Sequence, residues 1–240
     1  MRSSLDRRSF LKLGATGLCS LADVPLSFGA AAPITAQAAF DHFLLGASDL
    51  DAGIQWLEER TGVRAQFGGV HPGRGTRNAL ASLGERHYLE IIAPDPQQPD
   101  VADERGLRKL AHPSLIGWAI GTHELDGLQR KAQRAGFKTI AGPPGSRQRP
   151  DGKLLRWRTL GLETATPLVP FVIEWSADSP HPSADAPDAG RVAQLVFETP
   201  GPEPLRKALR ALGVVADIRR ASEPRIRLTL ATTKGRVELR

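Results

Sequence analysis

A pattern of strand, acidic turn and helix that returns three times constrains the fold of this chain more than any other feature. Short apolar segments at residues 40–46, 115–121 and 191–197 are each followed by an acidic turn and an amphipathic segment that ends near a glycine. The repeats begin about 75 residues apart, which is the mark of an internal duplication. Because duplicated units pack equivalent strands together, we expect equivalent positions to face one another across a shared cleft.

Each repeat predicts the element order βαβββ. The first helix carries the apolar positions Ile54 and Leu57 and ends at Gly62. Residues 68–75 have the composition of a loop. The other helices are expected at 125–135 and 203–212, and the strands at 40–46, 77–83, 87–92, 115–121, 154–160, 168–175, 191–197, 216–220, 226–231 and 236–239. We therefore predict an α+β fold of repeated βαβββ modules, with a cupped mixed sheet and the helices outside.

The N-terminus has the features of an export signal. Arg7 and Arg8 form a twin-arginine signature, a mildly apolar stretch follows, and residues 36–38 supply a small-x-small cleavage site. An amphipathic N-terminal helix or a membrane anchor is the alternative, although the stretch is short for a membrane span. We predict a signal peptide at 1–38, a paired domain at 39–182 and a third module at 191–240. The protein is then periplasmic, exported folded, with no stable membrane insertion after cleavage.

The composition excludes several classes of function. The chain has 32 Lys and Arg against 26 Asp and Glu, and only 5% aromatic residues. No basic stripe interleaved with stacking rings is present, so nucleic acid is not an expected partner. Cys19 is the only cysteine and lies within the predicted signal, so the mature protein has no disulfide and no thiol nucleophile. The sequence also has no GxSxG, P-loop or Rossmann motif.

Two glutamates within apolar strands are candidates for chemistry. Superposing the first strands of the two leading repeats puts His42 opposite Gly117, and superposing their last strands puts Glu90 opposite Glu174. A glutamate in an apolar strand is costly unless it is paired, protonated or bound to a cation. An imidazole with two carboxylates suits a divalent ion such as Zn, Mn, Fe or Ni. Alone, a histidine in a strand is more often a hydrogen-bonded core residue, and a glutamate in a strand usually lies on the solvent face.

Two further groups could shape a binding pocket. Residues 71–78 read as a glycine-rich loop that delivers His71 and Asn78 to a pocket rim, or as a wide turn with surface side chains. Arg156 and Arg158 share one face of a strand, with Trp157 on the other. Those arginines point into the cup to hold an anionic substrate, or they form a solvated face. His181 lies in a connector and is given no role.

Several motifs together resemble the vicinal oxygen chelate superfamily, in its glyoxalase-like branch. They are the run 41–45 with its acidic turn at 49–51, the loop 71–78, the strand 88–94 and the strand 171–175. The resemblance covers most of 40–182 firmly and the third repeat loosely. It implies the glyoxalase/dihydroxybiphenyl dioxygenase-like fold. Members of the superfamily are isomerases, dioxygenases, epimerases, antibiotic-modifying enzymes and metal-free drug-binding proteins.

The resemblance also implies a ligand set. A divalent metal is often held by a His on the first strand and Glu residues on the last strands, which carries over onto His42, Glu90 and Glu174. The pattern fails at Gly117, where a His or Gln would be expected. His71, His87 or His123 could supply the missing nitrogen, and His71 is the best placed of the three.

Two functional hypotheses follow, and the sequence leaves both open. In the first, the protein is a metal-dependent lyase, isomerase or dioxygenase acting on a small oxygen-rich or anionic molecule, with Glu174 able to detach from the metal and serve as a base. In the second, it is a metal-free binding or sequestering protein. The substrate contacts in the same cup are His71, Asn78, Arg156, Arg158 and Trp175. Whether the modules pair within one chain or across a homodimer also stays open.

Overall fold

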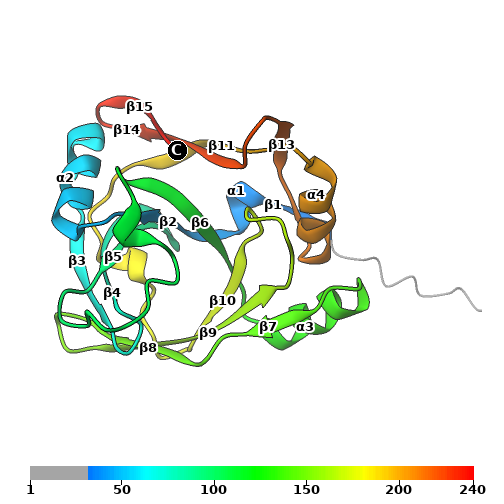
Figure 1. Cartoon of the computed structure of the whole chain (residues 1–240), viewed down its shortest axis with the longest axis horizontal. Coiled ribbons are helices and arrows are strands. Elements are labelled where there is room, and N and C mark those ends of the chain that lie inside the picture. Colours follow the sequence, from blue (N-terminus) through cyan, green and yellow to red (C-terminus); the bar gives the residue numbers. More distant parts are fainter. Residues whose placement is uncertain (1–31) are drawn as a thin grey trace, which may run out of the picture. The chain divides into compact units, whose positions relative to one another are not determined.

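The structure, a computed structural model, describes residues 32–240, so the twin-arginine signature and Cys19 lie outside the described residues. A nine-stranded sheet curls into an open cup (Figure 1). Its strands are β2 (Phe40–Gly46), β3 (Gln66–His71), β4 (Thr76–Gly84), β5 (His87–Pro94), β6 (Ser114–Gly121), β7 (Thr139–Ala141), β8 (Gly145–Gln148), β9 (Leu154–Leu162) and β10 (Phe171–Trp175).

The order of the strands reveals two modules joined within one chain. The sheet runs β3-β4-β5-β2-β6-β10-β9-β7, with β8 paired to β9. Strands β2 and β6, which open the two modules, lie antiparallel at its centre. Each has its own module's last strand as a parallel partner, β5 beside β2 and β10 beside β6. The predicted α+β fold of repeated modules is therefore confirmed.

The helices follow the predicted signals closely. Helix α2 (Leu50–Thr61) begins where the carboxylate of Asp49 accepts a hydrogen bond from the backbone N–H of Ala52 at 2.9 Å. It ends at Gly62, whose φ of 78° is a left-handed conformation that glycine adopts without strain. Helix α3 (Leu125–Arg134) belongs to the second module and α4 (Pro202–Ala211) to the third. Two 3₁₀ turns, η1 (Leu107–Lys109) and η2 (Pro182–Ala184), lie in connecting segments.

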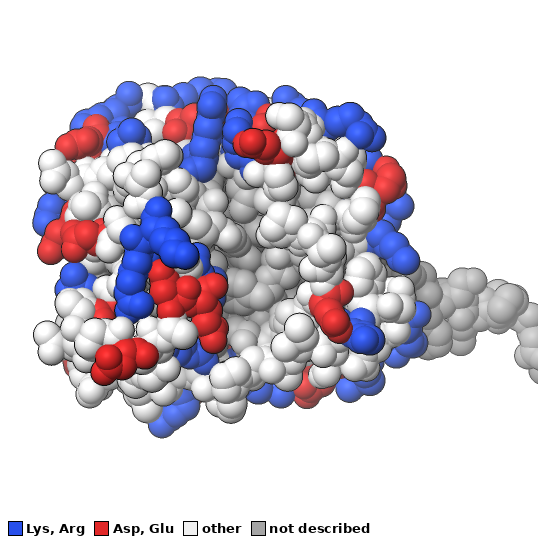
Figure 2. Space-filling model, in the orientation of Figure 1, with Lys and Arg blue, Asp and Glu red and all other residues white. Residues whose placement is uncertain are grey.

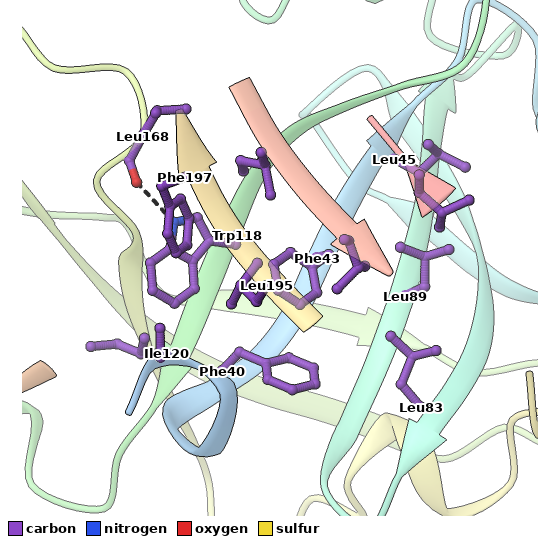
Figure 3. Close-up of a cluster of buried hydrophobic side chains, with 14 of the residues drawn as sticks. Phe40, Phe43, Leu45, Leu83, Leu89, Trp118, Ile120, Leu168, Leu195 and Phe197 are labelled. Carbon is purple, nitrogen blue, oxygen red and sulfur yellow. Dashed lines mark hydrogen bonds between the residues drawn. The ribbon is translucent and has the colours of Figure 1, made fainter. Parts of the chain in front are cut away.

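The third module covers the convex side of the cup. Its sheet has the order β13-β11-β14-β15, built from β11 (Arg191–Thr199), β13 (Asp217–Arg220), β14 (Arg225–Thr232) and β15 (Gly235–Leu239). The ring of Trp118 lies 4.9 Å from that of Phe197 and 6.3 Å from that of Phe43. Figure 3 shows this cluster, with the indole N–H of Trp118 donating to the carbonyl of Leu168 at 2.8 Å. Because this core buries the convex face, the concave face is left for a pocket.

A short N-terminal segment also belongs to the packed unit. Strand β1 (Ile34–Thr35) pairs with β12 (Val214–Val215), and helix α1 (Ala36–Ala39) follows. Ala36 is only 2% exposed and lies in the main core. The proposed cleavage site at 36–38 thus lies inside structured, packed chain. Among residues 32–240, no helix is long and apolar enough to cross a membrane.

Three segments of the nine-stranded sheet differ from the expected elements. The first half of the expected loop 68–75 belongs to strand β3, and only residues 72–75 form a turn. Strands β7 and β8 were not expected at all. All three lie toward the sides of the sheet, where pairing depends on backbone hydrogen bonds more than on alternating apolar side chains. These strands contain glycines and polar residues in place of alternating apolar residues, so the periodicity of the sequence did not predict them.

Candidate functional site

The concave face of the sheet holds a cavity of about 570 Å³. Figure 2 shows its mouth as a hollow, with charged side chains gathered along one side. Both modules supply walls, His42 and Glu90 from the first, and Phe171 and Trp175 from the second. Side chains two positions apart on a strand share a face, so the residues between them point into the core.

The imidazole of His42 is held by a buried carboxylate. His42 Nδ1 lies 2.7 Å from Oδ1 of Asp41. The other oxygen of Asp41 accepts from the indole N–H of Trp175 at 3.0 Å and lies 3.1 Å from Nε2 of His181. The opposite nitrogen of His181 contacts the Ser183 hydroxyl at 2.8 Å. These contacts leave His42 Nε2 directed toward the pocket, 3.6 Å from a carboxylate oxygen of Glu90.

A second group surrounds Glu90 from the other side. The side-chain amide of Asn78 donates to Glu90 at 2.6 Å and lies 3.4 Å from Nε2 of His71. The other nitrogen of His71 lies 2.8 Å from the hydroxyl of Thr76. Nε2 of His71 also lies 3.7 Å from a carboxylate oxygen of Glu90, so this imidazole faces both the carboxylate and its amide partner. The group therefore holds one carboxylate between two imidazoles.

The charges in the pocket follow from burial and from these contacts. Burial lowers the pKa of His71 to about 4, assisted by nearby arginines and opposed by Glu90, so this imidazole is neutral at pH 7. Burial alone would raise the pKa of Asp41, but hydrogen bonds from His181 and His42 bring it well below its ordinary value. Burial would likewise raise the pKa of Glu90, yet His71, His42, the Asn78 amide and Arg147 together lower it. Both carboxylates are therefore ionised.

Comparison with known sequences agrees with this geometry. Residues 40–213 match the family described as a glyoxalase-like domain. The chain belongs to this family. With the module order described above, the match supports membership of the vicinal oxygen chelate superfamily. No curated protein matches this glyoxalase-like domain protein significantly.

Several solved structures are similar to this glyoxalase-like protein. A hypothetical protein from Staphylococcus aureus aligns with a TM-score of 0.62 and 11% identity, over 84% of this chain and 98% of that chain. Methylmalonyl-CoA epimerase from Mycobacterium tuberculosis aligns with a TM-score of 0.43 and 19% identity, over 61% and 92%. The Streptomyces coelicolor enzyme, in complex with 2-nitronate-propionyl-CoA, has a TM-score of 0.44 and 21% identity, over 61% and 99%. The first likeness shows a shared fold.

The glyoxalase-like cup brings together most of the residues expected there. His42, His71, Asn78, Glu90 and Trp175 all line the cavity. Their roles as ligands or substrate contacts stay predictions, but their convergence is a property of the structure. Sequence reasoning placed His42 and Glu90 in one pocket through the repeat, and His71 and Asn78 through the glycine-rich loop 71–78.

The prediction that Glu174 lies in the pocket is wrong, because its side chain is on the other side of the sheet. Its carboxylate accepts from the backbone N–H of Leu125 at 3.0 Å and from Arg158 at 3.0 Å, beside helix α3. Strand register explains the error. Glu90 pairs with Leu44 on β2, and the equivalent pairing on β6 brings Phe171 opposite Ala119. Phe171 therefore occupies the position equivalent to Glu90, and an odd offset along a strand reverses the face.

The prediction that Arg156 and Arg158 point into the pocket is also wrong. Both side chains are about half exposed and pair with acids outside the cup, Arg156 with Asp178 at 3.1 Å and Arg158 with Asp126 at 3.1 Å. The solvated-face alternative was therefore the right one. Trp157, between them on the strand, lines the cavity instead.

A divalent metal fits these residues poorly. Among residues 32–240, no group of three or more His, Cys, Asp or Glu side chains has an arrangement able to hold one. Gly117 supplies no side chain, Phe171 replaces a carboxylate, and an oxygen of Glu90 is already bound by the amide of Asn78. The buried guanidinium of Arg147 adds a positive charge near Glu90.

Three further histidines, His87, His123 and His181, do not have the roles expected from the sequence. His123 is exposed, and His87 lies 2.6 Å from the carbonyl oxygen of Phe40, so neither supplies a nitrogen to the pocket. His181, to which the sequence assigned no role, is buried against Asp41. Neither this contact nor the burial of Arg147 has a local sequence signal, because both join distant segments.

Proposed function

We propose that this glyoxalase-like protein is an enzyme that moves a proton on a small, oxygen-rich organic molecule without using a metal ion. One observation carries the proposal: His42 is fixed through Nδ1 by the ionised carboxylate of Asp41 and presents Nε2 to a pocket. A neutral imidazole held in this way has its lone pair on Nε2, which is the arrangement of a general base.

The chemistry follows from the charges around His42. The Nε2 atom takes a proton from carbon next to a carbonyl group, and the electron pair of the broken C–H bond moves onto the carbonyl oxygen. The imidazolium that forms lies between Asp41 and Glu90, two carboxylates that stabilise its charge. Return of the proton to the substrate regenerates the neutral base. This is isomerase- or lyase-type chemistry.

Tyr88 supports the same proposal. Its ring stacks on that of His42, with the centroids 4.6 Å apart, and holds the base in place. Burial raises the pKa of the Tyr88 hydroxyl well above its ordinary value, so the group stays protonated at neutral pH and remains a donor. The cavity thus combines a base with a protonated hydroxyl on one wall.

A metal-free binding protein is the second candidate. Phe171, Trp157 and Trp175 give the second module an apolar wall in place of a second acid. Such a wall would suit a protein that sequesters a flat ligand without changing it. Export through the twin-arginine pathway to the periplasm is part of the proposal under either candidate.

The test is proton exchange in D₂O with 2-oxo-4-phenylbutyrate as the probe, followed by ¹H NMR at the carbon next to the carbonyl. We expect the protein to accelerate exchange at least about 100-fold over buffer, as general-base catalysis commonly does. H42Q should abolish the acceleration, while R156Q, on the outer face, should keep it. Binding of the probe without exchange would contradict the enzyme and favour the binding protein.

A further inference from the structure

Arg147 is a buried charge on the wall of the proposed active site. It lies on strand β8, is only 3% exposed and lines the same cavity as Glu90 and Tyr88. Its Nη1 atom is buried and has no hydrogen-bond partner within the described part of the chain. Burying an unpaired charge is costly, so buried arginines are normally matched by an anion.

The protein itself supplies little of that compensation. Glu90 is the largest electrostatic influence that favours the charged guanidinium, but its carboxylate is already bound by the Asn78 amide and flanked by two imidazoles. Burial outweighs it and lowers the pKa of Arg147. Since Arg147 forms no ion pair within 4 Å among residues 32–240, the free pocket holds a partly uncompensated positive charge.

The rest of the cavity is suited to an anion with a flat body. Three arginines and two acids lie along its lining, namely Arg74, Arg105, Arg108, Asp103 and Glu104. Arg74 and Arg105 act electrostatically on His71 deep in the pocket. The rings of Trp157 and Trp175 lie 5.4 Å apart and form an aromatic wall. Flat rings stack favourably on such surfaces.

We propose that Arg147 binds the carboxylate of a substrate that carries a planar ring or a similar flat group. The inference deepens the proposed function, on which it rests, by naming the substrate class and its anchor. A carboxylate fits better than a phosphate, because a dianion would be repelled more strongly by the ionised Glu90 nearby. The fork of a guanidinium also matches the two oxygens of a carboxylate.

The experiment measures binding apart from catalysis. Benzoate, benzamide and phenyl phosphate are titrated by calorimetry into the wild-type protein, R147Q, R147K and R156Q. Benzoate should bind the wild type and R156Q, and its affinity should fall at least about 10-fold in R147Q, since a charge-assisted contact is lost. R147K should fall between them, because lysine keeps the charge and loses the fork. Benzamide should bind weakly throughout.

Stability separates a binding role from a structural one. Removing an uncompensated buried charge should leave free R147Q at least as resistant to urea as the wild type. Destabilised R147Q with unchanged benzoate affinity, no benzoate binding to the wild type, or tighter binding of phenyl phosphate would each overturn the inference. H42Q should keep benzoate binding. Absence of proton exchange in the wild type, together with Arg147-dependent benzoate binding, would therefore refute the proposed function alone.

Discussion

Nε2 of His181 lies 3.1 Å from Oδ2 of Asp41, although 140 positions separate the two residues in the chain. The contact links the connector after the second module to the first strand of the first module. Asp41 in turn holds His42 at 2.7 Å, so the orientation of the proposed base depends on a distant residue. Trp175 adds an indole N–H to the same carboxylate oxygen as His181.

Replacing His181 should therefore impair His42 indirectly. In H181A one buried oxygen of Asp41 loses a hydrogen bond, and the free energy of unfolding should fall by about 1–3 kcal/mol. The proton-exchange rate should fall while the KM for the probe changes little, because His181 does not line the cavity. Kinetics and urea denaturation of H181A measure both effects, with H123A on the exposed surface as the control. Unchanged exchange in a destabilised H181A would refute the positioning role.

The burial of His71 predicts a specific dependence of stability on pH. Its pKa is about 4 in the folded protein, against about 6.5 in the unfolded chain. Between these values the unfolded chain binds a proton that the folded protein does not. Stability is therefore full above pH 6.5 and falls as the pH drops toward 4, by about 3 kcal/mol for this group.

The difference in stability between the wild type and H71Q should accordingly shrink as the pH falls from 7.5 to 4.5. Urea denaturation at several pH values measures this difference. H123Q, at an exposed position, serves as the control and should follow the wild type. Parallel curves for the wild type and H71Q would show that burial of His71 does not suppress its protonation.

Gly68 should prove sensitive to the smallest side chain. A Cβ there would lie 2.5 Å from Oδ1 of Asn78 and 3.1 Å from Nη1 of Arg147, and the first distance is shorter than van der Waals contact allows. G68A should displace these side chains and weaken benzoate binding. G152A, where a Cβ meets nothing but φ is 83°, tests backbone strain without a clash in the pocket. Benzoate affinity equal to wild type in G68A would contradict this packing.

Metal content offers a direct check on the ligand set. We expect the full-length protein, expressed with its export signal, to purify with far less than one divalent metal per chain. Glu174 faces away from His42 and Glu90, and among residues 32–240 no three His, Cys, Asp or Glu side chains are arranged to hold a metal ion. Elemental analysis of the wild type beside the H42A/E90A double variant decides the matter. Stoichiometric metal lost in the double variant would reverse the conclusion.

The position of the mature N-terminus is a further prediction. The backbone N–H of Ile34 donates to the carbonyl of Gly213 at 3.0 Å, and Ala36 is buried in the core. Cleavage after Ala38 would remove both contacts. We therefore expect the exported protein to begin before Ile34, as intact-mass measurement of a periplasmic fraction will reveal. A chain that begins at Ala39 and is as stable as the longer form would contradict this expectation.

Local pattern was enough to predict the modules. Apolar alternation, helix caps and glycine stops predicted most strands and all three principal helices, because these signals act over a few residues. It also put His42 and Glu90 in one pocket, since each lies on the inner face of a strand that opens or closes the same module. The edge strands β7 and β8 escaped, because backbone pairing rather than side-chain periodicity forms them.

What the sequence by itself determined is the repeat, the strand faces of the first module and the chemical types of residue available in the cup. Tertiary structure alone decided which of those residues meet. Glu174 was assigned to the wrong face because strand register depends on pairing with β6, and a shift of three positions reverses a side chain. Asp41, His181 and Arg147 come together only when distant segments pack, and no local interaction encodes such contacts.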